Sequence, residues 1–308
     1  LFTDGKLALG NLIAKEGSDL RFYVFNPLNW IRSDYADFPF DSSNPVHVVD
    51  ITTGEEVPFQ LVALSGKRYL RILASQIPSM GYKIFEIRNG EGQKFAGAVS
   101  LNGNVIENQY YQVTVTENGA IASWKDKTRN NRELVKSTNG LAVNDLGTGA
   151  GSIRVENEGA VSVTLVAESE SPLSHISRVT LFRDLARVEI QNEIRQNFDE
   201  TQTWSFGFDL NNSNIWHEEV GAIINAKLTS DGGHYSPRDF NSRYDWLTLN
   251  HFVDMSDGNL GVTLSNADCY FMRLGSSTVA QLDTRTPQIS VLAGGRVVGT
   301  GSGIYDQG

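Results

Sequence analysis

Cysteine is nearly absent from this chain of 308 residues, which contains a single one, Cys269. An internal disulfide is therefore excluded. Cys269 lies in the strand-like stretch 267–272, where a lone thiol is better interpreted as a small buried side chain than as a reactive group. Long apolar runs are missing too, since none approaches the roughly 18 residues that a membrane-spanning helix requires. We therefore expect no membrane partner.

Positive charge is in the minority. The chain has 26 Lys and Arg residues against 36 Asp and Glu residues, which gives a formal net charge of −10. Such a surface repels phosphate backbones, so we expect neither nucleic acid nor an anionic membrane as a partner. A neutral partner such as a sugar is not disfavoured by this balance. The share of hydrophobic residues, 40%, is ordinary for a globular protein.

The motifs that mark most catalytic and metal sites are missing as well. The glycine-rich runs 147–151 and 299–303 lack the Lys-Ser/Thr pair of a phosphate-binding loop and a following helical pattern, so we interpret both as turns. Asp257-Gly258 similarly predicts a β-turn apex rather than a calcium loop. No two carboxylates are paired by the sequence, although a sugar-cleaving enzyme needs two that face each other. We assign no catalytic residue to the chain.

The histidines are scattered singly and have no metal-binding spacing. They are His47, His175, His217, His234 and His251. Because His175 and His251 are flanked by apolar residues in strand-like runs, we interpret both as framework residues. The chain therefore offers no metal ligand that its sequence can identify.

Two-residue alternation is the dominant pattern, and it is sharpest in the stretch 106–135. Residues 111–115 alternate apolar and polar side chains, as in a half-buried β-strand. Asn118-Gly119 then supplies a pair that tolerates positive φ in a tight turn. With a second short strand at 120–124, the stretch predicts a hairpin that divides a smaller β unit from a larger one.

Similar patterns predict strands along almost the whole chain. In the first part they lie at 20–27, 35–40, 46–51, 57–64, 69–74 and 81–87. In the second part they lie at 153–155, 161–168, 175–182, 186–198, 203–210, 220–228, 246–253, 261–264 and 288–292. Neither heptads nor a repeat of 20–50 residues occurs. The predicted fold class is all-β.

The polar, glycine-rich run 88–94 is the best candidate for a domain boundary. We predict a small β-sandwich over residues 1–90, because its short strands recur at the spacing typical of sandwiches. A large antiparallel β domain is predicted over residues 91–308. The first 19 residues have no clear pattern, and within them 7–13 fits either a short helix or a strand.

One turn-rich segment, 231–246, combines histidine, tyrosine, arginine and tryptophan side chains. Sugar rings stack on aromatic faces while polar groups bind their hydroxyls, and functional groups concentrate on such loops. Its candidate sugar-contacting residues are His234, Tyr235, Arg243 and Tyr244. The alternative is a long surface loop whose aromatic residues only cover the sheet.

Several short motifs occur in a fixed order over nearly the whole chain. They are V-x-N-P-L-x-W-x-R at 24–32, V-P-x-Q at 57–60, P-x-x-G-Y at 78–82, E-N-x-x-Y at 107–111, G-x-I at 119–121, D-K at 126–127, R-E-L at 132–134, V-D-x-S-D-G at 253–258 and G-V-x-L at 261–264. Together they resemble the β-rich C-terminal half of glycoside hydrolase family 38, the α-mannosidases. Phe252 departs from the tryptophan that is commoner in that family.

This resemblance implies a small β-sandwich followed by a large, mutarotase-like antiparallel β supersandwich. In that family, a separate N-terminal α/β domain holds a zinc ion and the catalytic nucleophile of a retaining mechanism. No stretch of this chain resembles that domain. We therefore expect no cofactor in the chain and zinc in the missing domain. Asn250 and His251 precede Phe252, where the family has polar residues near the active-site rim, so they join the candidates.

Two hypotheses follow. In the first, the chain is the non-catalytic β portion of a zinc-dependent α-mannosidase, inactive alone, that begins after the α/β domain and stops before the final strands. Its partners are then a mannose-containing glycan and its own N-terminal catalytic domain. In the second, it is a stand-alone carbohydrate-binding or mutarotase-like module without hydrolase activity. The sequence leaves homo-oligomerisation open, and it leaves periplasmic, extracellular and cytoplasmic locations in a bacterium open, with a lysosomal type less favoured.

Overall fold

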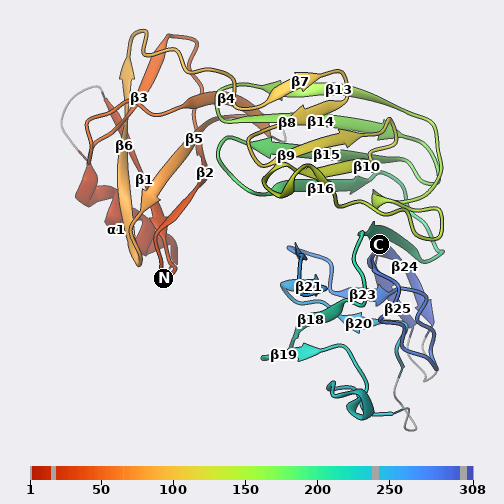
Figure 1. Ribbon diagram of the computed structural model, residues 1–308. Helices are drawn as coiled ribbons and strands as arrows, with labels where there is room; N and C mark the ends of the chain where they lie inside the picture. Colours follow the sequence, from red (N-terminus) through yellow and green to blue (C-terminus); the bar gives the residue numbers. More distant parts are fainter. Residues whose placement is uncertain (1, 15–18, 65, 238–242, 299–303, 308) are drawn as a thin grey trace. The chain divides into compact units, whose positions relative to one another are not determined.

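A computed structural model describes residues 2–14, 19–64, 66–237, 243–298 and 304–307 (Figure 1). These residues form antiparallel sheets and a single α-helix, α1 (Phe2–Ile13), so the predicted all-β fold class is confirmed. The helix also decides the alternative left open for residues 7–13. Within the described ranges, no helix is long and apolar enough to cross a membrane.

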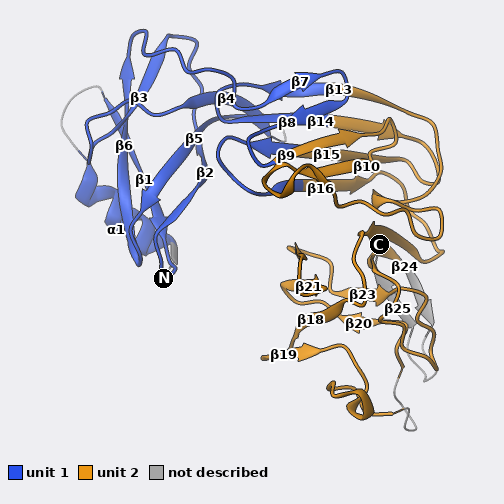
Figure 2. Ribbon diagram, viewed as in Figure 1, with its two compact units in different colours: residues 1–110, 155–165, 180–189 blue, residues 111–154, 166–179, 190–308 orange. Residues whose placement is uncertain are grey.

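The chain divides into two compact units, each made of separate stretches of sequence (Figure 2). Unit 1 comprises Leu1–Tyr110, Val155–Leu165 and Thr180–Glu189, and unit 2 comprises Tyr111–Arg154, Val166–Val179 and Ile190–Gly308. One four-stranded sheet contributes residues to both units, in the order β13 (Gly151–Glu158), β14 (Ser162–Ser169), β15 (His175–Phe182) and β16 (Val188–Ile194). The division into domains at residue 90 stays a prediction.

Unit 1 contains a sandwich of two three-stranded antiparallel sheets. One has the order β1 (Leu20–Asn26), β6 (Gly81–Asn89) and β3 (Val46–Asp50); the other has the order β2 (Arg32–Pro39), β5 (Lys67–Ile77) and β4 (Phe59–Leu64). Their inner faces share one core, in which Phe22 stacks on Phe38 and Phe85. Burial of such aromatic area is the main force that holds two sheets together. Unit 1 also includes a hairpin of β7 (Ser100–Asn102) and β8 (Val105–Glu107).

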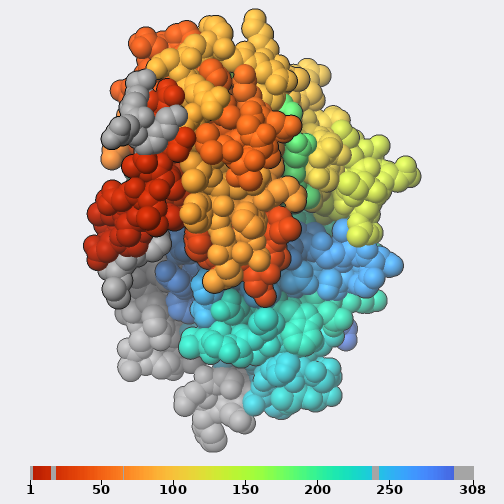
Figure 3. Space-filling view, turned by 90° about the vertical axis from the view of Figure 1, so that its left-hand side faces the viewer, coloured from red at the N-terminus to blue at the C-terminus, as the bar shows by residue number. Residues whose placement is uncertain are grey.

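Helix α1 lies against strand β1, where the Tyr23 hydroxyl donates to the carbonyl oxygen of Lys6 at 3.3 Å. Its other side is open to solvent, since Leu7 is 63% and Leu12 is 80% exposed. The space-filling view shows the helix at the surface beside strands of the sandwich (Figure 3). The helix therefore adds little to the core of unit 1.

Unit 2 begins with the hairpin that the sequence predicts. Strand β9 (Tyr111–Val115) pairs with β10 (Ile121–Asp126), and Gly119 in the turn has φ +89°. Val113, Val115 and Ile121 are fully buried, so the predicted alternation holds. The same sheet continues in the order β12 (Val143–Asp145), β17 (Gln202–Gly207), β24 (Gln288–Val298), β23 (Phe271–Leu274) and β20 (Leu247–Thr248), while β11 (Arg132–Glu133) pairs with β10 and β25 (Ile304–Gln307) with β24.

A second sheet of unit 2 is small and antiparallel. Its order is β19 (Ala222–Asn225), β18 (Asn214–Glu219), β21 (Phe252–Ser256) and β22 (Gly261–Ser265). The predicted turn at Asp257-Gly258 joins β21 to β22, and Gly258 has φ +87°. The continuous strand predicted at 220–228 is wrong, because Gly221 has φ +79° and turns the chain between β18 and β19. Two short 3-10 helices, η1 (Lys127–Arg129) and η2 (Thr229–Asp231), complete the described elements.

Three further expectations can be compared with the structure. His175 is a buried framework residue, with Nδ1 2.7 Å from the oxygen of Leu173 and Nε2 3.0 Å from that of Asn118. Residues 147–150 are irregular, with φ +138° at Gly147, but Gly151 already belongs to β13, so the turn predicted at 147–151 is one residue too long; 299–303 lies outside the described residues. Cys269 lies in a loop before β23 rather than in a strand, and burial raises the pKa of its thiol to about 11. The thiol is thus protonated at neutral pH.

Candidate functional site

The candidate site is built on strand β18, whose side chains alternate between the two faces of the small sheet. His217 is fully buried, whereas its neighbour Trp216 is 37% exposed on the opposite face. Glu219, two residues after His217, lies on the same face as the histidine. The strand therefore directs one imidazole and one carboxylate to one side of the sheet.

Tyr235 connects these two groups. Its hydroxyl donates to Oε1 of Glu219 at 2.7 Å, and its oxygen lies 3.1 Å from Nε2 of His217. The rings of Tyr235 and His217 stack, with 6.2 Å between centroids. Nδ1 of His217 lies 2.8 Å from the carbonyl oxygen of Thr248, and because a carbonyl only accepts, Nδ1 donates there. Because the one hydroxyl hydrogen of Tyr235 goes to Glu219 and the ring hydrogen of His217 goes to Thr248, Tyr235 is joined to Glu219 by a hydrogen bond and to His217 by ring stacking. The cluster of these three side chains is anchored to the backbone through Thr248.

Burial determines the protonation of this cluster. It lowers the pKa of His217, against the opposing effects of the Glu219 charge and the Thr248 carbonyl. Burial also raises the pKa of Tyr235, and the hydrogen bond to Glu219 raises it further. At neutral pH, Tyr235 is therefore a protonated donor held in one orientation.

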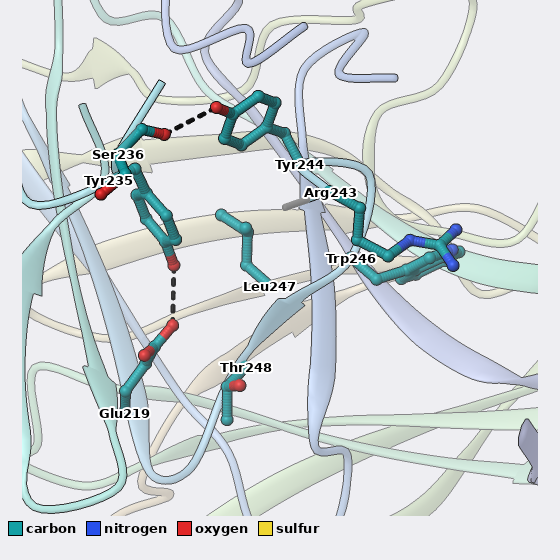
Figure 4. A pocket seen from close by; sticks show the side chains of 8 residues that line it. All are labelled: Glu219, Tyr235, Ser236, Arg243, Tyr244, Trp246, Leu247 and Thr248. Atoms are coloured by element: carbon teal, nitrogen blue, oxygen red, sulfur yellow. Dashed lines mark hydrogen bonds between the residues drawn. The ribbon is translucent and has the colours of Figure 1, made fainter. Parts of the chain in front are cut away.

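The cluster borders a pocket of about 300 Å³ (Figure 4). Its lining residues are Glu219, Tyr235, Ser236, Arg243, Tyr244, Trp246, Leu247 and Thr248. The Tyr244 hydroxyl donates to the carbonyl oxygen of Ser236 at 2.7 Å. This bond joins the part of the chain before residue 238 to the part after residue 242.

A cation and an aromatic ring define the other side of the pocket. Arg243 forms a two-pronged ion pair with Asp245, with nitrogen–oxygen distances of 2.7 and 2.6 Å. The guanidinium carbon of Arg273 lies 5.6 Å from the centre of the Trp246 ring. The volume is at the lower end of the roughly 300–1,000 Å³ typical of small-molecule sites. Aromatic rings next to fixed hydroxyl and carboxylate groups suit a ligand with an apolar face and several hydroxyls.

The six residues proposed from the sequence do not all meet here. Tyr235, Arg243 and Tyr244 line the pocket. His234 accepts from the backbone nitrogen of Asn225 at 2.8 Å and packs on Trp216, on the opposite side of the sheet. For all six, contact with a substrate stays a prediction.

The other two candidates lie away from the pocket. Asn250 donates its backbone nitrogen to the carbonyl oxygen of Glu218 at 3.2 Å. His251 lies 2.9 Å from a carboxylate oxygen of Glu218, and its side chain is 77% exposed. The interpretation of His251 as a framework residue is therefore wrong.

Sequence reasoning missed His217 and Glu219, the two residues at the base of the cluster. Their spacing of two residues is a usable signal only for a chain segment known to be a strand. Because the apolar residues that follow predicted a strand at 220–228, the shorter strand Asn214–Glu219 was not identified.

No three His, Cys, Asp or Glu side chains come together as a metal site in the part of the chain that the structure describes. The carboxylates and imidazoles near the pocket form pairs instead. We therefore assign no metal ligand to any residue named above.

Two solved structures share this fold. An α-mannosidase from Enterococcus faecalis V583 matches with a TM-score of 0.61 at 12% identity, over 94% of this chain and 41% of its own. A protein of glycosyl hydrolase family 38 from Enterococcus faecalis matches with the same TM-score and identity, over 89% and 40%. The chain thus spans about two-fifths of either protein, and at this identity the likeness concerns the fold alone. No family model and no curated protein matches the chain.

Proposed function

We propose that the chain is the non-catalytic β portion of a retaining, zinc-dependent α-mannosidase-like glycoside hydrolase. The observation that carries this proposal is the fold likeness to an α-mannosidase over 94% of the chain. The ordered motifs of the sequence, which resemble glycoside hydrolase family 38, support it independently. In this proposal, cleavage takes place in an N-terminal α/β domain of the parent protein.

The zinc ion belongs to that domain in our proposal. When bound, zinc holds sugar hydroxyls and stabilises developing charge. The described residues bring no three suitable ligands together, so we assign no ligand to them. What this chain contributes is support for the cleft and contacts to the glycan around the Tyr235 pocket.

Specific groups fit that role. Tyr235 is held as a donor by Glu219, and Trp246 offers an aromatic surface of the kind on which sugar rings pack. Since cleavage belongs to the N-terminal domain in this proposal, these contacts should contribute to binding more than to chemistry. His234, Asn250 and His251, which do not line this pocket, remain candidates for a rim outside it.

One observation favours the second hypothesis, a stand-alone carbohydrate-binding module. The Tyr235 pocket brings aromatic rings, a hydroxyl and a carboxylate of this chain together, and such groups can bind a sugar without a catalytic pair. A module of this kind would bind mannose-containing glycans and hydrolyse nothing.

The deciding experiment compares the natural full-length protein with residues 1–308 on an aryl α-mannoside. We expect the full-length protein to hydrolyse it, to lose activity with a chelator and to regain it with zinc. The 308-residue chain should be inactive. A full-length protein that is inactive with every metal tested would contradict the hydrolase proposal, and turnover by the 308-residue chain would reveal a catalytic pair that we have not identified.

The contribution of the pocket is tested in the same full-length protein. Trp246→Ala should raise KM roughly 3- to 10-fold and change kcat little, because aromatic packing is worth about 0.5–1.5 kcal/mol and binds substrate and transition state alike. Trp30→Ala is a matched control, since Trp30 is exposed and lies in unit 1. An unchanged KM for Trp246→Ala would remove the pocket from the substrate path.

A further inference from the structure

A second pocket of unit 2 lies on the polar face of its large sheet. Ser205 of β17, Ser290 of β24 and Arg273 of β23 are direct neighbours across three strands, so their side chains share one face. The opposite face is apolar, with Ile289 and Val291 buried in the core. The polar face is also covered, since Ser205 is 0% and Ser290 is 4% exposed. Polar side chains in such a position require partners.

The pocket on this face has a volume of about 210 Å³. Its lining residues include Thr203, Arg273, Ser276, Gln288 and Ser290, and none of the residues that line it is acidic. The volume is below the roughly 300 Å³ at which sites for drug-sized ligands begin, which indicates a single small group rather than an oligosaccharide.

Gln288 forms the framework of the pocket. Its side-chain nitrogen donates to Oγ of Ser205 at 2.6 Å and to the carbonyl oxygen of Thr138 at 3.1 Å. Its side-chain oxygen accepts from Asn139 at 3.3 Å. The Gln288 amide is therefore committed to the protein, and it fixes the position of the neighbouring strand residues.

Several donors that line the pocket have no hydrogen-bond partner among the described residues. Within the described chain, no residue exchanges a hydrogen bond with the hydroxyl groups of Thr203, Ser276 and Ser290. No described carboxylate lies within ion-pair distance of the Arg273 guanidinium, whose contact is the Trp246 ring. The nearby carboxylate of Asp283 already accepts from the backbone nitrogen atoms of Ser276 and Arg285, at 2.8 and 3.0 Å.

We propose that this pocket binds a compact oxyanion, a sulfate, phosphate or carboxylate group, held by Arg273 and by the hydroxyls of Thr203, Ser276 and Ser290. A planar guanidinium matches two oxygens of such a group, and hydroxyl donors satisfy the others. A cation is disfavoured because no acid lines the pocket. A neutral sugar would leave the charge of Arg273 without a partner.

The position of Arg273 also suggests where the anion comes from. Arg273 lines this pocket, and the Trp246 ring that it contacts lines the Tyr235 pocket. A glycan that packs on Trp246 could therefore place an acidic substituent on Arg273. This last step rests on the proposed carbohydrate function, whereas binding of the oxyanion itself does not.

The test is calorimetric titration of residues 1–308 with inorganic sulfate, inorganic phosphate, mannose 6-phosphate and mannose at constant ionic strength. We expect the three anions to bind at one site and mannose not to compete with phosphate. Arg273→Gln should weaken phosphate binding roughly 10- to 100-fold, because it removes the charge-assisted hydrogen bonds. Ser276→Ala, at an exposed loop position, should weaken it several-fold and guards against misfolding of the Arg273 variant. Arg195→Gln, whose arginine pairs with Glu193 on the surface, is the matched control and should bind as the unmodified chain does.

The outcomes distinguish an anion carried by a glycan from a free ion. They also distinguish failure of the anion proposal from failure of the hydrolase proposal. Tighter binding of mannose 6-phosphate than of phosphate supports a substituent carried by a glycan, and equal affinities support a free ion. Absence of anion binding, equal losses in the Arg273 and Arg195 variants, or competition by mannose would each overturn the proposal. An inactive full-length protein would leave the Arg273-dependent binding intact and would contradict only the hydrolase proposal.

Discussion

His217 is held neutral by its surroundings, although one neighbour favours its charge. Burial removes water from the imidazole and disfavours protonation, and the Glu219 carboxylate opposes this effect only in part. The donor on Nδ1 is bound to the Thr248 carbonyl, which fixes the ring. Such a residue stabilises the site through its orientation rather than through its charge.

A pH dependence follows from this arrangement. In the folded chain the pKa of His217 is below its usual value of 6.5, so below pH 6.5 the unfolded chain binds a proton that the folded chain does not. The free energy of unfolding should therefore fall as the pH drops through 6.5, by at most about 1.4 kcal/mol per pH unit from this residue. Above that pH the contribution is complete.

Urea unfolding of the natural chain and of His217→Gln between pH 5 and 7.5 measures this effect. The glutamine can still donate to Thr248 but does not titrate, so the stability difference between the two proteins should shrink towards acidic pH. Parallel profiles would show that His217 is protonated equally in both states.

At the residue scale, the sequence predicts some site residues and not others for a clear reason. Tyr235, Arg243 and Tyr244 lie in a loop whose composition is itself conspicuous. His217 and Glu219 are ordinary residues of a short strand, and their importance arises from contacts with Tyr235, 18 and 16 residues away. The local sequence pattern contains no information about these long-range contacts.

At the level of single elements, the β9–β10 hairpin depends on one glycine. Gly119 has φ +89°, and a Cβ there would lie 2.4 Å from Cβ of Ser177. Gly119→Ala should therefore lower the free energy of unfolding by roughly 2–5 kcal/mol, because backbone strain and overpacking add. Thermal unfolding monitored by tryptophan fluorescence measures the loss.

A matched hairpin separates the two causes. Gly103, between β7 and β8, has φ +61°, and a Cβ added there would meet no atom within 4 Å. Gly103→Ala should cost only the backbone term, about 1–2 kcal/mol. Equal costs at both glycines would mean that Ser177 moves away freely.

Element prediction succeeds where apolar residues recur without interruption and fails where a turn follows an apolar residue. Strand β15 has the predicted bounds 175–182, and all of its residues except Arg178 are buried. Val220, in contrast, is 91% exposed beside the turn at Gly221. An apolar side chain at a turn imitates the start of a strand, and only the fold reveals that it faces solvent.

For the molecule as a whole, charge gives the simplest prediction. With a formal net charge of −10, the chain should bind double-stranded DNA more weakly than the roughly 10⁻⁴–10⁻⁶ M typical of non-specific DNA-binding proteins. Electrophoretic mobility shift at low salt measures this, and co-sedimentation with anionic vesicles extends it to membranes. Salt-sensitive association with either one would contradict the charge argument.

The all-β fold class can be predicted from the sequence, since apolar and polar residues alternate along nearly all of it. The division into two compact units cannot be predicted in this way, because strands β13 to β16 each pass from one unit to the other. Contacts that join residues 71 and 162, or 35 and 189, are set by tertiary packing. The sequence around each of these residues does not predict which distant residue it will contact.

The alternation of strand β18 has a consequence for sequence change in this region. Substitutions within Asn214–Glu219 alter one side chain at a time, whereas deletion of a single residue would exchange the two faces of the strand. His217 and Glu219 would then turn away from Tyr235, and Trp216 and Glu218 would take their places. Related chains should therefore vary in residue type here while keeping the length of this segment constant.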